Sequence, residues 1–141
     1  MIRQVKKILY IFLFAVVVSS CQKADDNGDL GGFWKLLKIE DFATGVTMDT
    51  KEYKRFWSIQ LDVLATSSED DDSYNYNYGG KGRFQHVGDS LFVQMITVSS
   101  KSDLKKVGLY NPEDERFGVV LLNRDKMILR SKDALLEFRK F

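Results

Sequence analysis

Hydrophobic and polar residues alternate with a period of two over most of the chain beyond residue 31. A strand with one buried face has this period, because its successive side chains point to opposite sides of the sheet. The alternation is clearest over residues 56–64, which we predict to be one half-buried strand. Its buried face would carry Trp57, Ile59, Leu61 and Val63, and its solvent face Ser58, Gln60 and Asp62. The dominant pattern therefore predicts β-structure.

Further strands are predicted wherever the alternation resumes between turn-forming residues. They cover residues 33–40, 81–86, 90–98, 117–123, 126–130 and 134–141. Gly88-Asp89 suits a tight hairpin between two of these ranges, and the last three ranges should form a meander. Two less regular segments, residues 74–79 and 109–110, bring the number of available strands to about eight.

One short helical turn is expected at residues 111–116, where Asn111 precedes Pro112 and acidic residues fill the first turn. The sequence contains no long amphipathic helix and no internal repeat. Exposed strand edges promote aggregation, and closure into a barrel removes them. We therefore expect an all-β fold in the form of a small antiparallel β-barrel.

The N-terminal segment has the layout of a secretory signal, with a short basic start followed by 11 apolar residues, 8–18. A membrane-spanning helix needs about 20 apolar residues, so this run is too short to be one. Val18-Ser19-Ser20-Cys21 follows and resembles the lipobox of bacterial lipoproteins. That resemblance implies cleavage before Cys21 and acylation of its thiol. We predict a signal peptide over residues 1–20, a lipidated Cys21 with a flexible tether over residues 21–30, and one domain over residues 31–141.

The residues after Cys21 are polar, include glycine and are rich in aspartate, as expected for a solvated tether. A short acidic cluster at this place also resembles the surface-export signals of some gut-type Gram-negative anaerobes. Gln22 directly after the cysteine fits sorting to the outer membrane. Two or three acyl chains would anchor the protein stably. The expected location is the outer membrane, with the cell surface and the periplasmic face both left open.

Composition excludes several classes of partner. The chain has 141 residues, enough for one domain, and a single cysteine and a single histidine, which rules out an intrachain disulfide and a multi-histidine metal site. Three of its 21 basic residues and none of its 20 acidic ones lie in residues 1–20. The remainder is therefore slightly acidic, and we expect no nucleic-acid partner.

A tryptophan motif opens the first predicted strand. In Gly31-Gly32-Phe33-Trp34, Gly32 and Trp34 form a Gly-x-Trp motif that resembles the opening of lipocalin-like barrels. The resemblance implies that Gly32 allows a tight turn into the barrel and that Trp34 plugs its closed end. It also implies that Arg139, near the end of the last strand, lies over the Trp34 ring as a cation–π partner.

The wider pattern is similar to small, largely uncharacterised lipocalin-like lipoproteins of gut anaerobes. The matching segments are residues 32–36, 57–62, 82–84, 88–93, 127–131 and 136–141. The resemblance says little about a ligand; the Gly-x-Trp opening and the surplus of aromatic residues favour a barrel that binds a small apolar molecule or a glycan at the cell envelope. The domain is short for a ligand-carrying lipocalin, so its own side chains can fill the interior.

Tyr74, Tyr76 and Tyr78 alternate with asparagines and would share one face of an extended strand. Such a row could stack on sugar rings or dock a protein, and the alternative is that it packs on the barrel wall. The acidic residues 69–72 beside it lack the glycine and closing glutamate of a calcium loop and fit a solvated loop. No metal site is expected.

Catalysis is not expected either. His86 is the only imidazole, and no nucleophile elbow, oxyanion hole or phosphate-binding loop accompanies it. The carboxylates fall mostly in turns, and no cofactor motif is present. Two functions stay open. One is the non-catalytic binding module described above. The other is a protein-interaction module, an inhibitor or an accessory subunit of an outer-membrane complex, that uses the tyrosine- and asparagine-rich hairpin.

Overall fold

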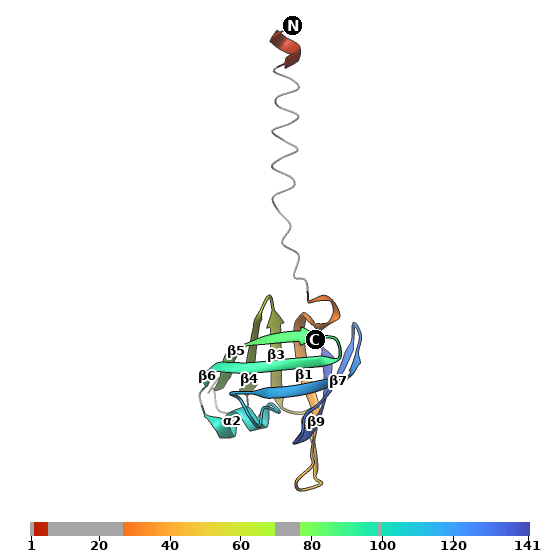
Figure 1. The fold of residues 1–141 in the computed structure, drawn as a ribbon. Coiled ribbons are helices and arrows are strands. Elements are labelled where there is room, and N and C mark those ends of the chain that lie inside the picture. Colours follow the sequence, from red (N-terminus) through yellow and green to blue (C-terminus); the bar gives the residue numbers. More distant parts are fainter. Residues whose placement is uncertain (1, 6–26, 70–76, 99) are drawn as a thin grey trace.

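The computed structural model describes residues 2–5, 27–69, 77–98 and 100–141. In it the strands follow one another around a single antiparallel sheet in nearly sequential order (Figure 1). The elements are η1 Gly28–Leu30, β1 Gly32–Asp41, β2 Thr47–Asp49, β3 Lys54–Gln60, β4 Val63–Glu69, β5 Asn77–Val87, β6 Ser90–Val98, α2 Lys101–Lys106, β7 Glu115–Leu122, β8 Lys126–Arg130 and β9 Ala134–Lys140.

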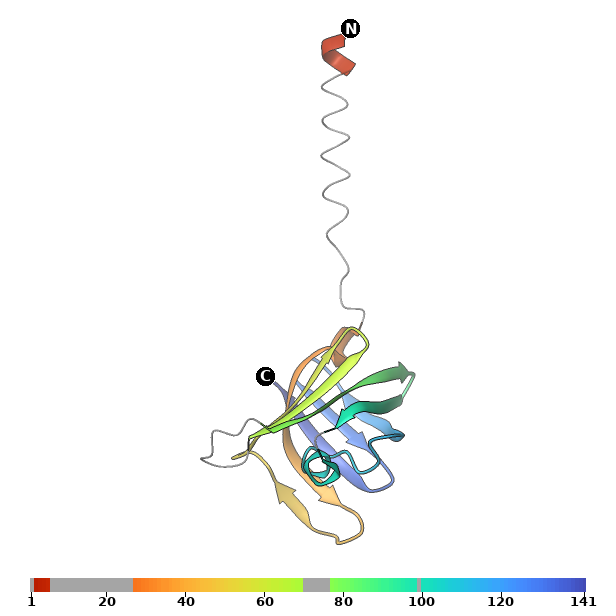
Figure 2. The same cartoon turned by 90° about the vertical axis from the view of Figure 1, so that its left-hand side faces the viewer.

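The first strand closes the barrel. One edge of β1 pairs with β3 at residues 32–35, and its other edge pairs with β9. β2 pairs only with residues 38–40 of β1, which lie beyond the part of β1 that pairs with β3. Figures 1 and 2 show this β1–β2 hairpin projecting beyond the rest of the barrel. Eight strands therefore form the closed antiparallel barrel, as predicted, and β2 is a short addition to its rim.

Two of the predicted turns are confirmed. Gly88 has a φ of 57° and turns β5 into β6, and β7, β8 and β9 form the expected meander. A left-handed φ of this kind favours glycine, which has no Cβ to clash with the backbone.

The prediction of one strand over residues 56–64 is wrong. β3 ends at Gln60, and Leu61, with a φ of 56°, turns the chain into β4. Leu61 is 61% and Val63 40% exposed, so neither belongs to the buried face. The side-chain amide of Asn27 donates to the Leu61 carbonyl at 2.8 Å and stabilises the turn. No glycine, proline or asparagine marks this turn in the sequence, and the alternation simply continues through it.

The short helix also lies elsewhere than predicted. It is α2, whereas Asn111 to Asp114 form a tight turn in which the Asp114 N–H donates to the Asn111 carbonyl at 3.1 Å. The buried carboxylate of Glu115 accepts a hydrogen bond from the Asn111 N–H, and its burial raises its pKa. This contact favours the turn over a helix, because the side chain of the first β7 residue already satisfies the amide. Residues 109–110 are not a strand.

The barrel interior is filled with side chains. Trp57 lies at its centre, with its ring 4.7 Å from that of Phe138 and 5.6 Å from that of Phe117. Leu30 and Trp34 close the end of the barrel at η1, called here the η1 end. Leu104, Val107 and Leu109, in and just after α2, are fully buried on the other side of the core, at the α2 end.

Candidate functional site

A pocket of about 370 Å³ lies at the α2 end. Its walls come from the end of β1, the β1–β2 hairpin, the start of β3, and α2 with the loop that follows it. The lining residues are Ile39, Asp41, Thr44, Val46, Met48, Arg55, Lys105, Lys106 and Tyr110. The pocket is therefore on the rim of the barrel and not in its filled interior.

One wall of the pocket is apolar. Ile39 points inward from β1 and is 4% exposed, while Val46 and Met48 belong to the projecting hairpin and are 58% and 47% exposed. The Tyr110 ring completes this wall. An apolar molecule placed here would cover hairpin side chains that water reaches in the absence of a ligand.

Hydrogen bonds to the Asp41 carboxylate link the β1–β2 hairpin to the loop after α2. The Asp41 carboxylate accepts hydrogen bonds from the Thr44 N–H at 2.9 Å, the Thr44 hydroxyl at 3.1 Å and the Tyr110 hydroxyl at 2.8 Å. These donors lower the pKa of Asp41, the Thr44 N–H contributing most and Tyr110 next. Burial, followed by the bond to Asp41, raises the pKa of Tyr110. At neutral pH Asp41 is charged and Tyr110 is a neutral donor.

Three cations surround the pocket. The Arg55 guanidinium donates to the Lys106 carbonyl at 3.1 Å, and the Lys105 ammonium lies 5.1 Å from the centre of the Tyr110 ring. The Lys106 ammonium lies 4.0 Å from the Asp103 carboxylate. Asp41 is the single carboxylate among the lining residues. The pocket therefore has an excess of positive charge.

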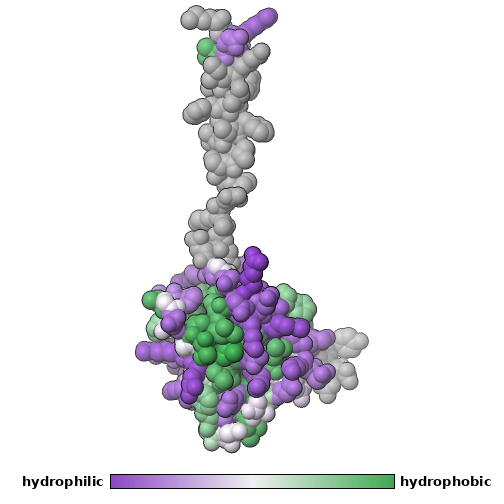
Figure 3. Space-filling view, turned by 90° about the vertical axis from the view of Figure 1, so that its right-hand side faces the viewer, coloured by the Kyte–Doolittle hydropathy of each residue, from purple (hydrophilic) through white to green (hydrophobic). Residues whose placement is uncertain are grey.

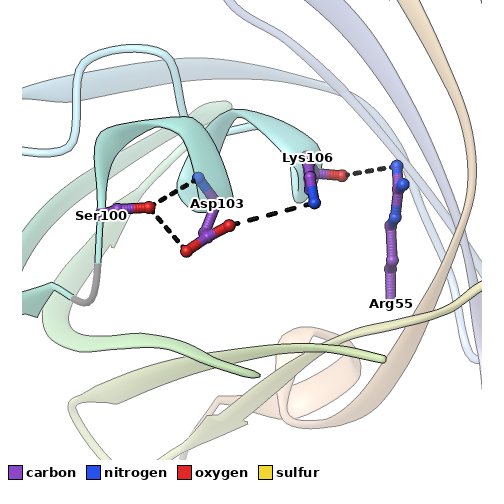
Figure 4. A network of polar contacts seen from close by, with 4 residues as sticks. All are labelled: Arg55, Ser100, Asp103 and Lys106. Carbon is purple, nitrogen blue, oxygen red and sulfur yellow. Dashed lines mark hydrogen bonds and ion pairs between the residues drawn. The ribbon is translucent and has the colours of Figure 1, made fainter. Parts of the chain in front are cut away.

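The cations are positioned by the way α2 is capped and docked. The Ser100 hydroxyl accepts from the Asp103 N–H at 3.2 Å and donates to the Asp103 carboxylate at 2.6 Å, which caps the helix N-terminus (Figure 4). The Trp57 indole N–H donates to the Val107 carbonyl at 2.9 Å and fixes the other end. Figure 4 shows the contacts of Ser100 and Asp103 continuing from the Asp103 carboxylate to Lys106, whose carbonyl accepts from Arg55.

The motif residues at the η1 end are only partly arranged as the resemblance implied. Trp34 is fully buried and donates to the Leu30 carbonyl at 2.8 Å, and Gly32 has a φ of 128°. The cation over the Trp34 ring is Lys140, at 4.7 Å from its centre, and not Arg139, which is exposed. Residues alternate along β9, so Lys140 shares the inward face with Phe138, whereas Arg139 points outward.

Several other candidates cannot be placed. Cys21, Tyr74 and Tyr76 lie outside the described residues. The backbone of Tyr78 pairs with Ser67 in β4, and its side chain is not described. His86 is exposed on β5, and the described residues contain no group of three His, Cys, Asp or Glu side chains that could hold a metal ion.

No helix in the described ranges is long and apolar enough to cross a bilayer.

Sequence reasoning missed the pocket because its residues are far apart along the chain, from Ile39 to Tyr110, and converge only when the barrel closes. The one local signal was Lys105-Lys106, a basic pair that follows an apolar residue in a segment without strand periodicity. A basic pair of this kind is usually a solvated surface feature, so it did not identify a site by itself.

A closed antiparallel barrel that opens with Gly32 and Trp34 is the architecture of lipocalin-like proteins. A family model described as a lipocalin-like domain matches residues 15–141. The chain belongs to this lipocalin-like family.

Two solved structures from Bacteroides resemble the fold. A lipocalin-like protein from Bacteroides uniformis ATCC 8492 has a TM-score of 0.64 and 19% identity, over 81% of this chain and 100% of that one. An uncharacterised protein from Bacteroides eggerthii DSM 20697 has a TM-score of 0.59 and 17% identity, over 79% of this chain and 98% of that one. No curated protein matches the chain. At these identities the two structures support the fold alone.

Proposed function

We propose that this chain is a non-catalytic lipoprotein of the outer membrane, anchored through Cys21, which binds a small amphipathic anion in the pocket at the α2 end. The ligand class is an apolar body that carries one acidic group. The observation that carries the proposal is the pocket itself, in which an apolar wall faces three cations and one carboxylate.

The size and lining of the pocket favour an apolar body over a glycan. Its volume of about 370 Å³ falls in the range of small-molecule sites. Ile39 and Val46 offer no hydrogen bonds to sugar hydroxyls, and the Met48 sulfur, a weak acceptor, already accepts from the Arg55 guanidinium at 3.6 Å. The nearby Asp41 carboxylate already accepts three hydrogen bonds from Thr44 and Tyr110 and has little capacity left.

The charges favour an acidic group on the ligand. Lys105, Lys106 and Arg55 together outweigh Asp41 and Asp103, the partner of Lys106, and hydrogen bonds between a cation and an anion are among the strongest in proteins. Lys105 is exposed and lies on the Tyr110 ring, where it can meet a ligand without losing a buried partner.

The anchor and the pocket would lie at opposite ends of the domain. The chain enters the barrel through η1, while the pocket is at the α2 end (Figure 1). If Cys21 is held in a bilayer, the pocket is on the side of the domain away from the tether and stays open to solvent.

Ligand binding is tested by calorimetric titration with two probes, myristate and tetradecanol, which share an alkyl chain and differ in charge. We expect myristate to bind more tightly, and V46D to weaken myristate binding about ten-fold, since it adds a negative charge to the apolar wall. The matched control V87D changes an equally exposed valine at the far end of the barrel and should leave binding unchanged. K105Q should remove the preference for myristate over tetradecanol, whereas K81Q should not. Equal affinity of V46D and the native chain would contradict this site.

The anchor is tested separately in cells of a Gram-negative host. We expect the native chain to incorporate labelled palmitate and to sediment with outer membranes, and C21A to do neither, because it lacks the thiol that is acylated. S19A keeps a small residue before Cys21 and should behave like the native chain. Unlabelled native protein, or C21A that still sediments with membranes, would contradict the lipid anchor.

A further inference from the structure

Three phenylalanine rings form a cluster on the outer wall of the barrel. Phe33 on β1 stacks on Phe56 of β3, with ring centres 4.7 Å apart and planes at 13°. The Phe141 ring meets both edge-on, at 6.0 Å and 5.5 Å. Phe33 is 39% and Phe141 73% exposed. Because Phe33 and Phe141 remain exposed on the outer wall, the Phe cluster is a surface feature and not part of the barrel core.

A row of cations adjoins the Phe cluster on the same wall. Lys35 on β1 is the register partner of both Phe56 and Arg139, and Arg139 is in turn the partner of Lys126 on β8. All three point outward, because the inward-facing residues next to them, Trp34 and Leu36 on β1, Met127 on β8 and Phe138 on β9, are buried. Within this basic row, Lys126 pairs with Glu137 at 3.1 Å. Figure 3, which looks onto the side where Figure 1 labels β7 and β9, shows a hydrophilic band flanked by hydrophobic side chains.

The Phe cluster lies where the chain enters the domain. The Phe141 N–H donates to the Phe33 carbonyl at 2.8 Å, and the neighbouring Lys140 ammonium donates to the Asp29 carbonyl, in η1, at 2.8 Å. Asn27, the residue before η1, is six residues from Cys21 in the sequence. Six extended residues span at most about 22 Å, so an anchor at Cys21 keeps Asn27, where the chain enters the domain, within about that distance of the bilayer surface.

We propose that the Phe cluster and the basic row lie on the surface of an anionic bilayer, with the aromatic rings at the headgroup level and the cations on the lipid phosphates. This inference rests on the proposed anchor. Exposed aromatic rings beside lysine and arginine are the combination that binds membrane interfaces. The bilayer is favoured over a second copy of the chain because the tether itself brings this wall to the membrane, and because two basic rows facing each other would repel.

The test uses the chain from Cys21 onward, which contains every element of the barrel, and couples its only cysteine to a maleimide lipid in vesicles. Attachment then does not depend on acylation in cells. F141W places an indole in the Phe cluster, and V46W places one at the opposite end. The vesicles contain phosphatidylcholine and phosphatidylglycerol, with and without bromine on the acyl chains. Trp34 and Trp57 are fully buried, and their emission is subtracted with the native chain.

We expect brominated vesicles to quench the introduced indole of F141W several-fold more than that of V46W. Adding K35Q and R139Q should reduce this quenching, and so should replacing phosphatidylglycerol with phosphatidylcholine. Equal quenching of F141W and V46W would overturn the proposal while leaving the anchor and the pocket untouched. Shielding of the F141W indole in solution, together with the mass of a dimer, would also overturn it and assign the wall to a second copy.

Discussion

Trp57→Ala is expected to lower the free energy of unfolding by about 4 kcal/mol, which is most of what a small domain has. Trp57 is fully buried between Phe117 and Phe138, so its removal leaves a large cavity in the centre of the barrel. It also removes the hydrogen bond to the Val107 carbonyl that docks α2. Urea denaturation followed by circular dichroism would measure the loss.

Trp57→Phe is the informative comparison. It keeps most of the ring and loses the hydrogen bond, so we expect a cost of about 1–2 kcal/mol. Phe56→Ala removes the neighbouring aromatic ring, which points outward from β3. It should lower the free energy of unfolding by less than Trp57→Ala does, because its ring is not in the core. A Trp57→Ala variant as stable as the native chain would mean that the barrel interior is not packed as described.

Gly82→Ala is expected to cost about 3 kcal/mol, although it adds only one methyl group. A Cβ at this position would overlap the Gln94 carbonyl oxygen and lie 2.6 Å from the Met95 Cα, both in the backbone of β6. β5 is held between β4 and β6 at this point, so neither neighbour can move without breaking ladder hydrogen bonds. Thermal and urea unfolding of the variant would give the cost.

Gly88→Ala separates backbone conformation from crowding. Unlike Gly82, Gly88 has a positive φ, 57°, but a Cβ there meets nothing within 4 Å. We expect a loss of about 1 kcal/mol, the ordinary cost of a left-handed residue with a side chain. If Gly82→Ala cost no more than Gly88→Ala, the close approach of β5 and β6 would be wrong.

The barrel could be predicted from the sequence because alternation within each strand reports which side is buried, and most strands are bounded by recognisable turns. The alternation does not reveal the turn at Leu61, because an apolar residue occupies the turn and continues the pattern. Nor does it show that Lys140 lies over Trp34, because which of Lys140 and Arg139 faces inward depends on the exact alternation of β9.

The pocket could not be predicted from the sequence because its residues come together only in the closed barrel. Asp41, Arg55 and Tyr110 have no shared motif, and their proximity depends on how far β1 extends past β3 and where α2 docks. Both are properties of the closed barrel and not of any local segment. The Phe cluster was missed similarly, because Phe33, Phe56 and Phe141 belong to three different strands or their ends.

The projecting β1–β2 hairpin has a consequence for how such a protein can diversify. β2 pairs with β1 alone, so Val46 and Met48 are outside the hydrogen-bonded ring that holds the barrel together. If the pocket binds a ligand as proposed, substitutions at these two positions would change its specificity at little thermodynamic cost to the scaffold. Relatives with the same barrel would then be free to differ in specificity through a few hairpin residues, while the strands beneath them stay unchanged.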